Sequence, residues 1–280
     1  MSKLNVNLLA ARLKRFEENT NASKFAKHLW KPSEGKQDIR IVPYKFNPEN
    51  PFIELKFYYK LGDNNYLAPC TFGKPDPVLE TIEALRAGGS NEEKKLAAKL
   101  APVTRTYVPI IVRGEEELGV RFWGFGAKVY RQLLMLMVNP KYGDITSYTE
   151  GRDIEVTFTA ATKKKNAAGQ SFPETDILAD PNVSPVVDPS RRDLMEKVKD
   201  QVDILTIFPL KSYDELKEAV ERWINPKLEP LDESVTPETE PFDEEEVVKE
   251  TASKEQPSTS KSKDELADEF ERFFNTNEDN

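Results

Sequence analysis

Basic and aromatic residues recur together on two neighbouring segments of this sequence. Arg105 and Tyr107 are two positions apart, and Arg121, Trp123 and Phe125 repeat this spacing. Residues two apart on a β-strand point to the same face, so each segment would present a guanidinium group beside rings. Guanidinium groups neutralise phosphates, and flat rings stack on unpaired bases. The pattern predicts a single groove that binds single-stranded nucleic acid.

Two further groups of residues extend this predicted site. They are Lys56, Tyr58, Lys60 and Tyr66 on an early hairpin, and the lysine run Lys163, Lys164 and Lys165. Lysines would contact the phosphate backbone, and the tyrosines would add surfaces for stacking. A structural interpretation stays open for each ring, because strands favour aromatic residues in general. The lysine run alone is typical of a solvated loop.

The elements that must position these residues are short strands interrupted by helices. Alternation predicts strands at 38–42, 52–59, 66–70, 105–112, 120–125 and 153–160. Helix caps at Asp76, at Ser90 with Glu93 and at Ser212 with Glu215 predict an insertion of two helices at 77–100 and a last helix after 212. A further helix is expected at 127–138. The expected fold is mixed β with helical insertions around a five-stranded barrel of the oligonucleotide/oligosaccharide-binding (OB) type, although periodicity does not establish closure.

Charge divides the chain into three parts. The net charge is −9, but residues 229–280 hold 18 acidic against 5 basic residues, and the first 45 residues hold 10 basic against 4 acidic ones. The N-terminal part can therefore attract a polyanion although the whole protein is acidic. The expected organisation is an N-terminal basic arm at 1–20, a binding core at 21–225 and an acidic tail at 226–280.

Both terminal parts carry apolar residues at helical spacing. The arm has Leu4, Leu8, Leu9, Leu13 and Phe16 on one helical side, near Arg12, Lys14 and Arg15. This pattern predicts an amphipathic helix that mediates self-association, and packing of this helix on its own domain is an equally good interpretation.

The tail is rich in Pro, Glu, Ser and Thr up to about residue 262, which predicts disorder. Near its end the tail carries a candidate partner-docking motif of Leu266, Phe270, Phe273 and Phe274. The alternative is that this acidic end only makes the protein more soluble.

Composition excludes several other classes of protein. With one cysteine, Cys70, and one histidine, His28, the chain forms no internal disulfide and no ordinary structural zinc site, and we expect no cofactor. No apolar run of membrane-spanning length and no secretory signal is evident, so a cytosolic location is expected. The body lacks a glycine-rich phosphate loop, a histidine pair and a compact carboxylate cluster, which argues against a nuclease or other enzyme.

Three segments also resemble a known family in their order along the chain. They are RTYVPIIV at 105–112, VRFWGFGAKV at 120–129 and GRDIEVTF at 151–158. Over about residues 20–225 the chain resembles the replicative single-stranded DNA-binding, or helix-destabilising, proteins of T-even-type tailed phages. By this resemblance Arg105, Tyr107, Trp123 and Lys128 fall on or beside DNA-contact positions, and Arg12, Lys14 and Arg15 form the basic cluster of the arm.

The resemblance implies a cooperative protein that coats single-stranded DNA during phage replication, recombination and repair in the cytoplasm of a bacterial host. The acidic tail would recruit replication and recombination proteins. The best-known members carry a zinc site of one histidine and three cysteines in the insertion, and these ligands are absent here. We expect apolar packing of the helices at 77–100 to replace the metal. An RNA-binding translational regulator and a scaffold whose tail is the active part remain alternatives.

Overall fold

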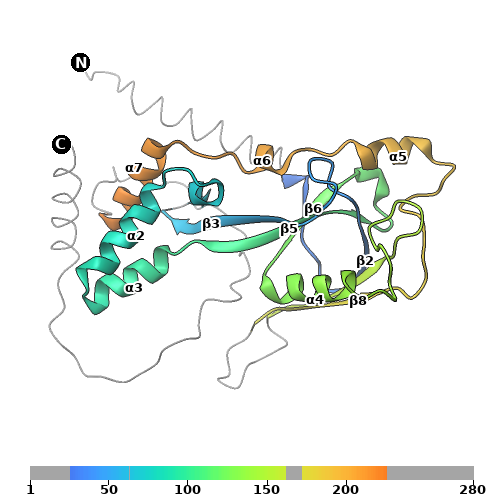
Figure 1. The fold of residues 1–280 in the computed structure, drawn as a ribbon, viewed down its shortest axis with the longest axis horizontal. Helices are drawn as coiled ribbons and strands as arrows, with labels where there is room; N and C mark the ends of the chain where they lie inside the picture. The colour runs from blue at the N-terminus through green and yellow to red at the C-terminus, as the bar shows by residue number, and fades with distance from the viewer. Residues whose placement is uncertain (1–25, 63, 162–171, 226–280) are drawn as a thin grey trace, which may run out of the picture. The chain divides into compact units, whose positions relative to one another are not determined.

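The computed structural model describes residues 26–62, 64–161 and 172–225 (Figure 1). Within these ranges, eight strands belong to one mixed sheet and are accompanied by six α-helices. Chain contacts define two compact units. Unit 1 combines the described residues up to Glu54 with Arg105–Phe208, and unit 2 combines Leu55–Thr104 with the described residues from Pro209 onward. None of the helices in the described ranges has the length and hydropathy that crossing a membrane requires.

The sheet of unit 1 is open. Its strand order is β1 (Leu29–Trp30), β6 (Arg121–Phe125), β5 (Val103–Val112), β2 (Gly35–Ile41), β7 (Ile154–Thr159) and β8 (Glu174–Ala179). All neighbours along this path are antiparallel except β1 and β6, which are parallel. A barrel requires its end strands to pair, and β1 and β8 do not pair among the described strands. The expected five-stranded barrel is therefore not confirmed.

Both faces of the unit 1 sheet are covered. On one face α4 (Ala127–Met137) packs Val129 and Leu133 against alternate residues of β5, Val108 and Ile110. The other face includes Ile111 and packs against α5 (Arg192–Lys199). Figure 1 shows α4 on one side of these strands, with α5 and α6 (Ile204–Ile207) on the other. Strand β5 is therefore buried almost throughout instead of presenting a solvent face.

Unit 2 is built from a hairpin and three helices. Its elements are β3 (Ile53–Leu61) from Leu55 onward, β4 (Asn64–Leu67), the 3-10 helix η1 (Pro69–Phe72), α2 (Pro77–Gly88), α3 (Asn91–Leu100) and α7 (Tyr213–Ile224). The capping predictions are confirmed, because Asp76 caps α2 and capping boxes begin α3 and α7 at Ser90 and Ser212. The helices share an apolar core with the hairpin that includes Val78, Leu100 and Leu216.

A charged network lies in the interior of unit 1. The fully buried Arg40 donates from Nε to Asp153 Oδ1 at 2.9 Å and also contacts Ser184 Oγ. Arg113 donates from Nε to Asp153 Oδ2 at 3.0 Å and from Nη2 to Asp153 Oδ1 at 2.7 Å. The Asp153 carboxylate therefore pairs with two guanidinium groups, one from Arg40 on β2 and one from Arg113 directly after β5.

A second polar cluster lies in the core of unit 2. The Tyr58 hydroxyl donates to Asp76 Oδ2 at 2.7 Å, while Asp76 Oδ1 accepts from the backbone N–H groups of Val78 at 3.2 Å and Leu79 at 3.3 Å. Burial, followed by the hydrogen bond to Asp76, raises the pKa of Tyr58 well above its usual value. Tyr58 is therefore a neutral donor inside the core, and the predicted solvent exposure of its ring is wrong.

Candidate nucleic-acid interface

The register between β5 and β6 separates the two predicted basic and aromatic clusters. Val108 lies opposite Trp123, and Tyr107 lies opposite Gly124. Residues directly opposite each other in an antiparallel pair point to the same face of the sheet. Arg105 and Tyr107 therefore point to one face, whereas Trp123 and Phe125 point to the other. The prediction that both clusters line one groove is wrong.

The face of Trp123 belongs to the core. Trp123 is only 2% exposed, and its ring lies 5.7 Å from that of Trp30 and 4.7 Å from that of Phe125, measured between centroids. Phe125 is also buried. Neither ring is available for base stacking in this structure, so their predicted exposure is wrong. Arg121 on the same strand is mostly buried and donates from Nη2 to Glu115 at 2.5 Å.

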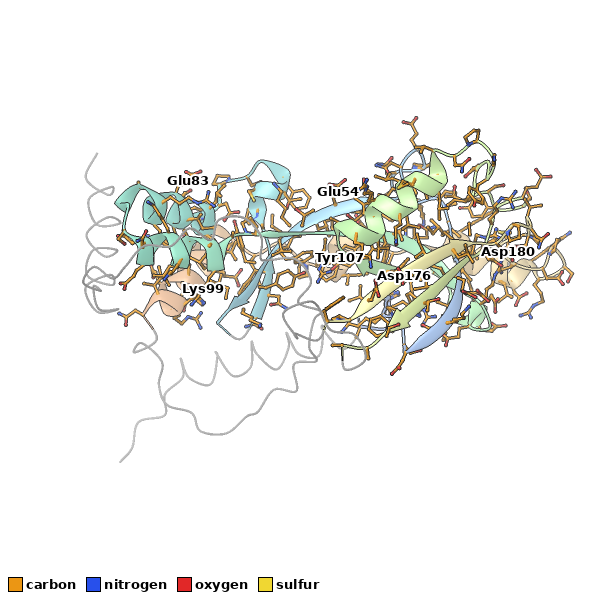
Figure 2. The ribbon with its side chains drawn as sticks, turned by 90° about the horizontal axis from the view of Figure 1, so that it is seen from below. Glu54, Glu83, Lys99, Tyr107, Asp176 and Asp180 are labelled. Atoms are coloured by element: carbon orange, nitrogen blue, oxygen red, sulfur yellow. The ribbon has the colours of Figure 1, made fainter. Side chains whose placement is uncertain are left out.

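Tyr107 lies flat against its neighbouring strand. A Cβ added to Gly124 would lie 2.6 Å from Tyr107 Cε1, so the ring occupies the space that glycine leaves. The Phe208 ring covers it with a centroid distance of 5.1 Å, and Tyr107 is 4% exposed (labelled in Figure 2). The half-buried Arg105 lies beside Gly126 in the same way, 3.6 Å from where a Cβ would be. Tyr107 is therefore also not the exposed ring that was predicted.

An exposed ring does occur in the loop that follows β2. Phe46 is 52% exposed, and Lys45 Nζ lies 5.8 Å from its centroid. Tyr44 anchors the loop, because its hydroxyl donates to Asp203 at 3.1 Å and accepts from the Ile204 N–H at 3.3 Å. Burial raises the pKa of Tyr44 to about 12, so this hydroxyl stays protonated near neutral pH. The loop therefore presents a ring and a cation from a fixed position, as stacking on a nucleotide requires.

Sequence reasoning missed Phe46 because the residue belongs to no alternating strand. The segment Pro43–Pro48 holds two aromatic residues and a lysine within a polar turn. Tyr44 turns inward against Phe122, with ring centroids 5.9 Å apart, which leaves Phe46 outside. An aromatic residue beside a lysine in a proline-bounded turn is the local signal that was available.

Unit 2 also has an exposed ring, but it lies beyond the hairpin that was predicted to carry one. Lys56 and Lys60 are exposed, Tyr66 is half-buried and Tyr58 is buried. Phe72, at the end of η1, is exposed. Thr71 Oγ1 accepts from the Lys56 N–H at 3.2 Å, which places η1 beside this strand. The exposed Phe72 therefore directly follows a residue that is hydrogen-bonded to the backbone of Lys56.

Lys128 is exposed at the beginning of α4 and is already engaged by acidic residues. Its Nζ lies 2.9 Å from Glu174 and 3.8 Å from Asp176, both on β8. Figure 2 labels Asp176 on this yellow edge strand. A phosphate would compete with two carboxylates for Lys128, and the predicted contact with DNA stays a prediction.

Several predicted contacts lie outside the described residues. They are Lys163, Lys164 and Lys165, the arm residues Arg12, Lys14 and Arg15, and the tail residues Leu266, Phe270, Phe273 and Phe274. Their roles stay predictions. Much of the basic surplus identified from the sequence belongs to these segments.

Comparison with known families gives one match. A family model described as gp32 DNA binding protein like matches residues 33–224. This range contains β2 through α7 and includes residues of both units. None of the curated proteins matches the chain.

Proposed function

This chain belongs to the gp32-like family of DNA-binding proteins, and we therefore propose that it binds single-stranded DNA stoichiometrically, with little sequence preference. The family match over residues 33–224 carries this proposal. We further propose that binding, without catalysis, is the whole activity of the core. The lack of nucleotide-binding and acid–base motifs in the sequence of the body supports this.

The proposed contacts are the exposed rings with lysines near them. In unit 1 these are Phe46 and Lys45, and in unit 2 they are Phe72 and Lys56. Each lysine would neutralise a phosphate. The logarithm of the binding constant would therefore fall with the logarithm of the salt concentration, with a slope of about 0.7 per contact. Each ring would stack on one base and contribute about 1–3 kcal/mol. Because every base has an aromatic face, such contacts give affinity without sequence specificity.

Replacing Phe46 by alanine tests this proposal. We expect affinity for an unstructured oligonucleotide to fall about 5- to 150-fold, which corresponds to the loss of one stacked base. Phe46→Trp should retain binding, since a larger ring still stacks. Fluorescence anisotropy with a labelled oligonucleotide at fixed salt gives the comparison.

The matched control is Leu118→Ala, which removes another exposed apolar side chain, 65% exposed against 52% for Phe46, that carries no ring. We expect this variant to bind as the unchanged protein does. If Phe46→Ala and Leu118→Ala bound the oligonucleotide with equal affinity, Phe46 would not be part of the interface. A protein that binds no single-stranded DNA at all would refute the proposed function itself.

We also propose the finer roles that the sequence suggests. The arm at 1–20 would contact a neighbouring molecule on DNA and produce cooperativity, supported by its basic and amphipathic pattern. The tail would recruit replication, recombination and repair proteins in the cytoplasm of a phage-infected bacterium, supported by the aromatic motif near its end. An OB-type relationship of the unit 1 sheet is likewise a proposal, and it rests on short antiparallel strands without closure.

Truncation after Lys227 should tighten DNA binding at low salt. The removed segment from 228 to 280 carries 18 acidic and 5 basic residues, and it competes with DNA for cationic surface. We expect a gain of about 3- to 10-fold near 20 mM salt that disappears near 300 mM, where charges are screened within a few ångströms. Titrating both proteins at the two salt concentrations measures it. Weaker binding after truncation would contradict the competition.

A further inference from the structure

Helix α4 has an apolar outer face. Val129 and Leu133 point into the core of unit 1, whereas Leu134, Met135 and Val138 on the outside are 37%, 62% and 77% exposed. These three positions are neighbours on a helix surface. The outside of a surface helix is usually polar, and contiguous exposed apolar side chains usually mark a contact. We call Arg131, Leu134, Met135 and Val138 the α4 outer face.

Positive charge borders this apolar surface. Arg131 is exposed one helical turn before Met135, and Lys141 is exposed in the turn that follows the helix. Neither side chain forms an ion pair with another described residue. Lys128, one turn further back, is neutralised by Glu174 and Asp176. The occupant of the α4 outer face should therefore combine apolar side chains with negative charge.

The charge requirement distinguishes between segments of this chain. The N-terminal arm is apolar on one side but carries Arg12, Lys14 and Arg15, which Arg131 would repel. A second α4 would bring like charges together in the same way. The end of the tail has the required composition, because residues 264–274 hold five acidic residues against one basic residue, Arg272. Their apolar residues Leu266, Phe270 and Phe273 recur at intervals of four and three.

We propose that residues 264–274 dock on the α4 outer face of the same molecule as a short amphipathic helix. The apolar anchors at intervals of four and three match the way a helix lies in an apolar surface of a partner. Phe270 and Phe273 would cover Met135 and Val138, and the acidic residues would approach Arg131 and Lys141. Docking would hide from other proteins the same aromatic residues that a partner would recognise.

The linker permits this contact for any arrangement of the two units. Residues 226–263 span about 35 Å on average as a flexible chain and about 120 Å when fully extended. A tether of this length gives an effective concentration on the order of 1 mM. A contact with a dissociation constant near 0.1 mM would then be occupied about nine-tenths of the time. The inference does not depend on DNA binding, so it can fail while the proposed function holds.

Hydrogen exchange of the full-length chain without DNA tests the contact from both sides. One variant carries Met135→Glu with Val138→Glu, and the other carries Phe270→Ser with Phe273→Ser. In the variant with Met135→Glu and Val138→Glu, we expect backbone amides at 264–274 to exchange about tenfold faster. Docking slows exchange in proportion to the ratio of docked to undocked molecules, which is about ten here. Amides at 134–138 should exchange faster in the second variant.

Two matched controls separate docking from general effects of charge or of lost aromatic residues. Val183→Glu places a charge on another exposed apolar position, and Phe242→Ser removes a tail phenylalanine outside the proposed segment. Neither should change exchange at 264–274 or at 134–138. Unchanged exchange in both test variants would overturn the proposal. Protection that grows with protein concentration would also overturn it, because a second molecule would then be the occupant.

Discussion

Asp153→Ala should lower the free energy of unfolding by about 3–5 kcal/mol, because it leaves a buried guanidinium group without its carboxylate. Arg40 is fully buried, and Asp153 is its only acidic hydrogen-bond partner among the described residues. Arg113 loses two hydrogen bonds to the same carboxylate. Urea unfolding followed by circular dichroism measures the change, and an unchanged m-value would show that the same surface is exposed on unfolding.

Glu155→Ala is the matched control for this prediction. Glu155 lies two residues away and pairs with Lys36 at 2.8 Å, but both side chains are accessible to solvent. Exposed pairs contribute less than about 1 kcal/mol, so this variant should unfold close to the unchanged protein. If the two variants were equally stable, the buried network would not hold unit 1 together in the way that its geometry indicates.

Local chemistry in the sequence located four of the six described α-helices, and it missed α5 and α6. Asp76, the Ser90 capping box and the Ser212 capping box all begin helices as predicted, because a cap satisfies backbone N–H groups within three residues of itself. The β3–β4 hairpin was also predicted, since the glycine and asparagine residues at its turn act locally. Strand β8 was missed because its sequence, ETDILA, alternates poorly, and β1 was missed because it has only two residues.

The orientation and exposure of the predicted site residues were predicted less well, because they depend on register and on coverage by distant segments. Spacing correctly placed Tyr107 with Arg105, and Trp123 with Phe125, but pairing between strands decides whether two such sets share a face. Nothing near Tyr107 in the sequence shows that Phe208 covers it. Gly124 was a usable signal, since glycine inside a strand often marks the close approach of another group.

The two most exposed rings among the described residues, Phe46 and Phe72, belong to a loop and to the 3-10 helix η1, not to strands of the sheet. A sheet covered on both faces, as in unit 1, has little room for solvent-facing aromatic residues on its central strands. Phe46 and Phe72 instead follow strand ends, where one neighbour is fixed in the protein by a hydrogen bond: Tyr44 to Asp203, and Thr71 to Lys56. In the proposed mode of binding, such anchored positions would let a rigid domain contact a flexible single strand.

Asp76→Ala should destabilise unit 2 by about 3 kcal/mol. The change removes the cap of a helix and, in addition, a buried hydrogen bond to a carboxylate. The carboxylate caps α2 and also accepts from the Tyr58 hydroxyl and from the Cys70 N–H at 3.1 Å. Ser212→Ala removes only a cap, that of α7, and should cost about 1 kcal/mol. Equal losses of stability in the two variants, measured by urea unfolding, would show that the contact with Tyr58 contributes nothing.

Adding Tyr58→Phe to the Asp76→Ala variant should restore part of the lost stability, because it removes the hydroxyl that would otherwise be buried without an acceptor.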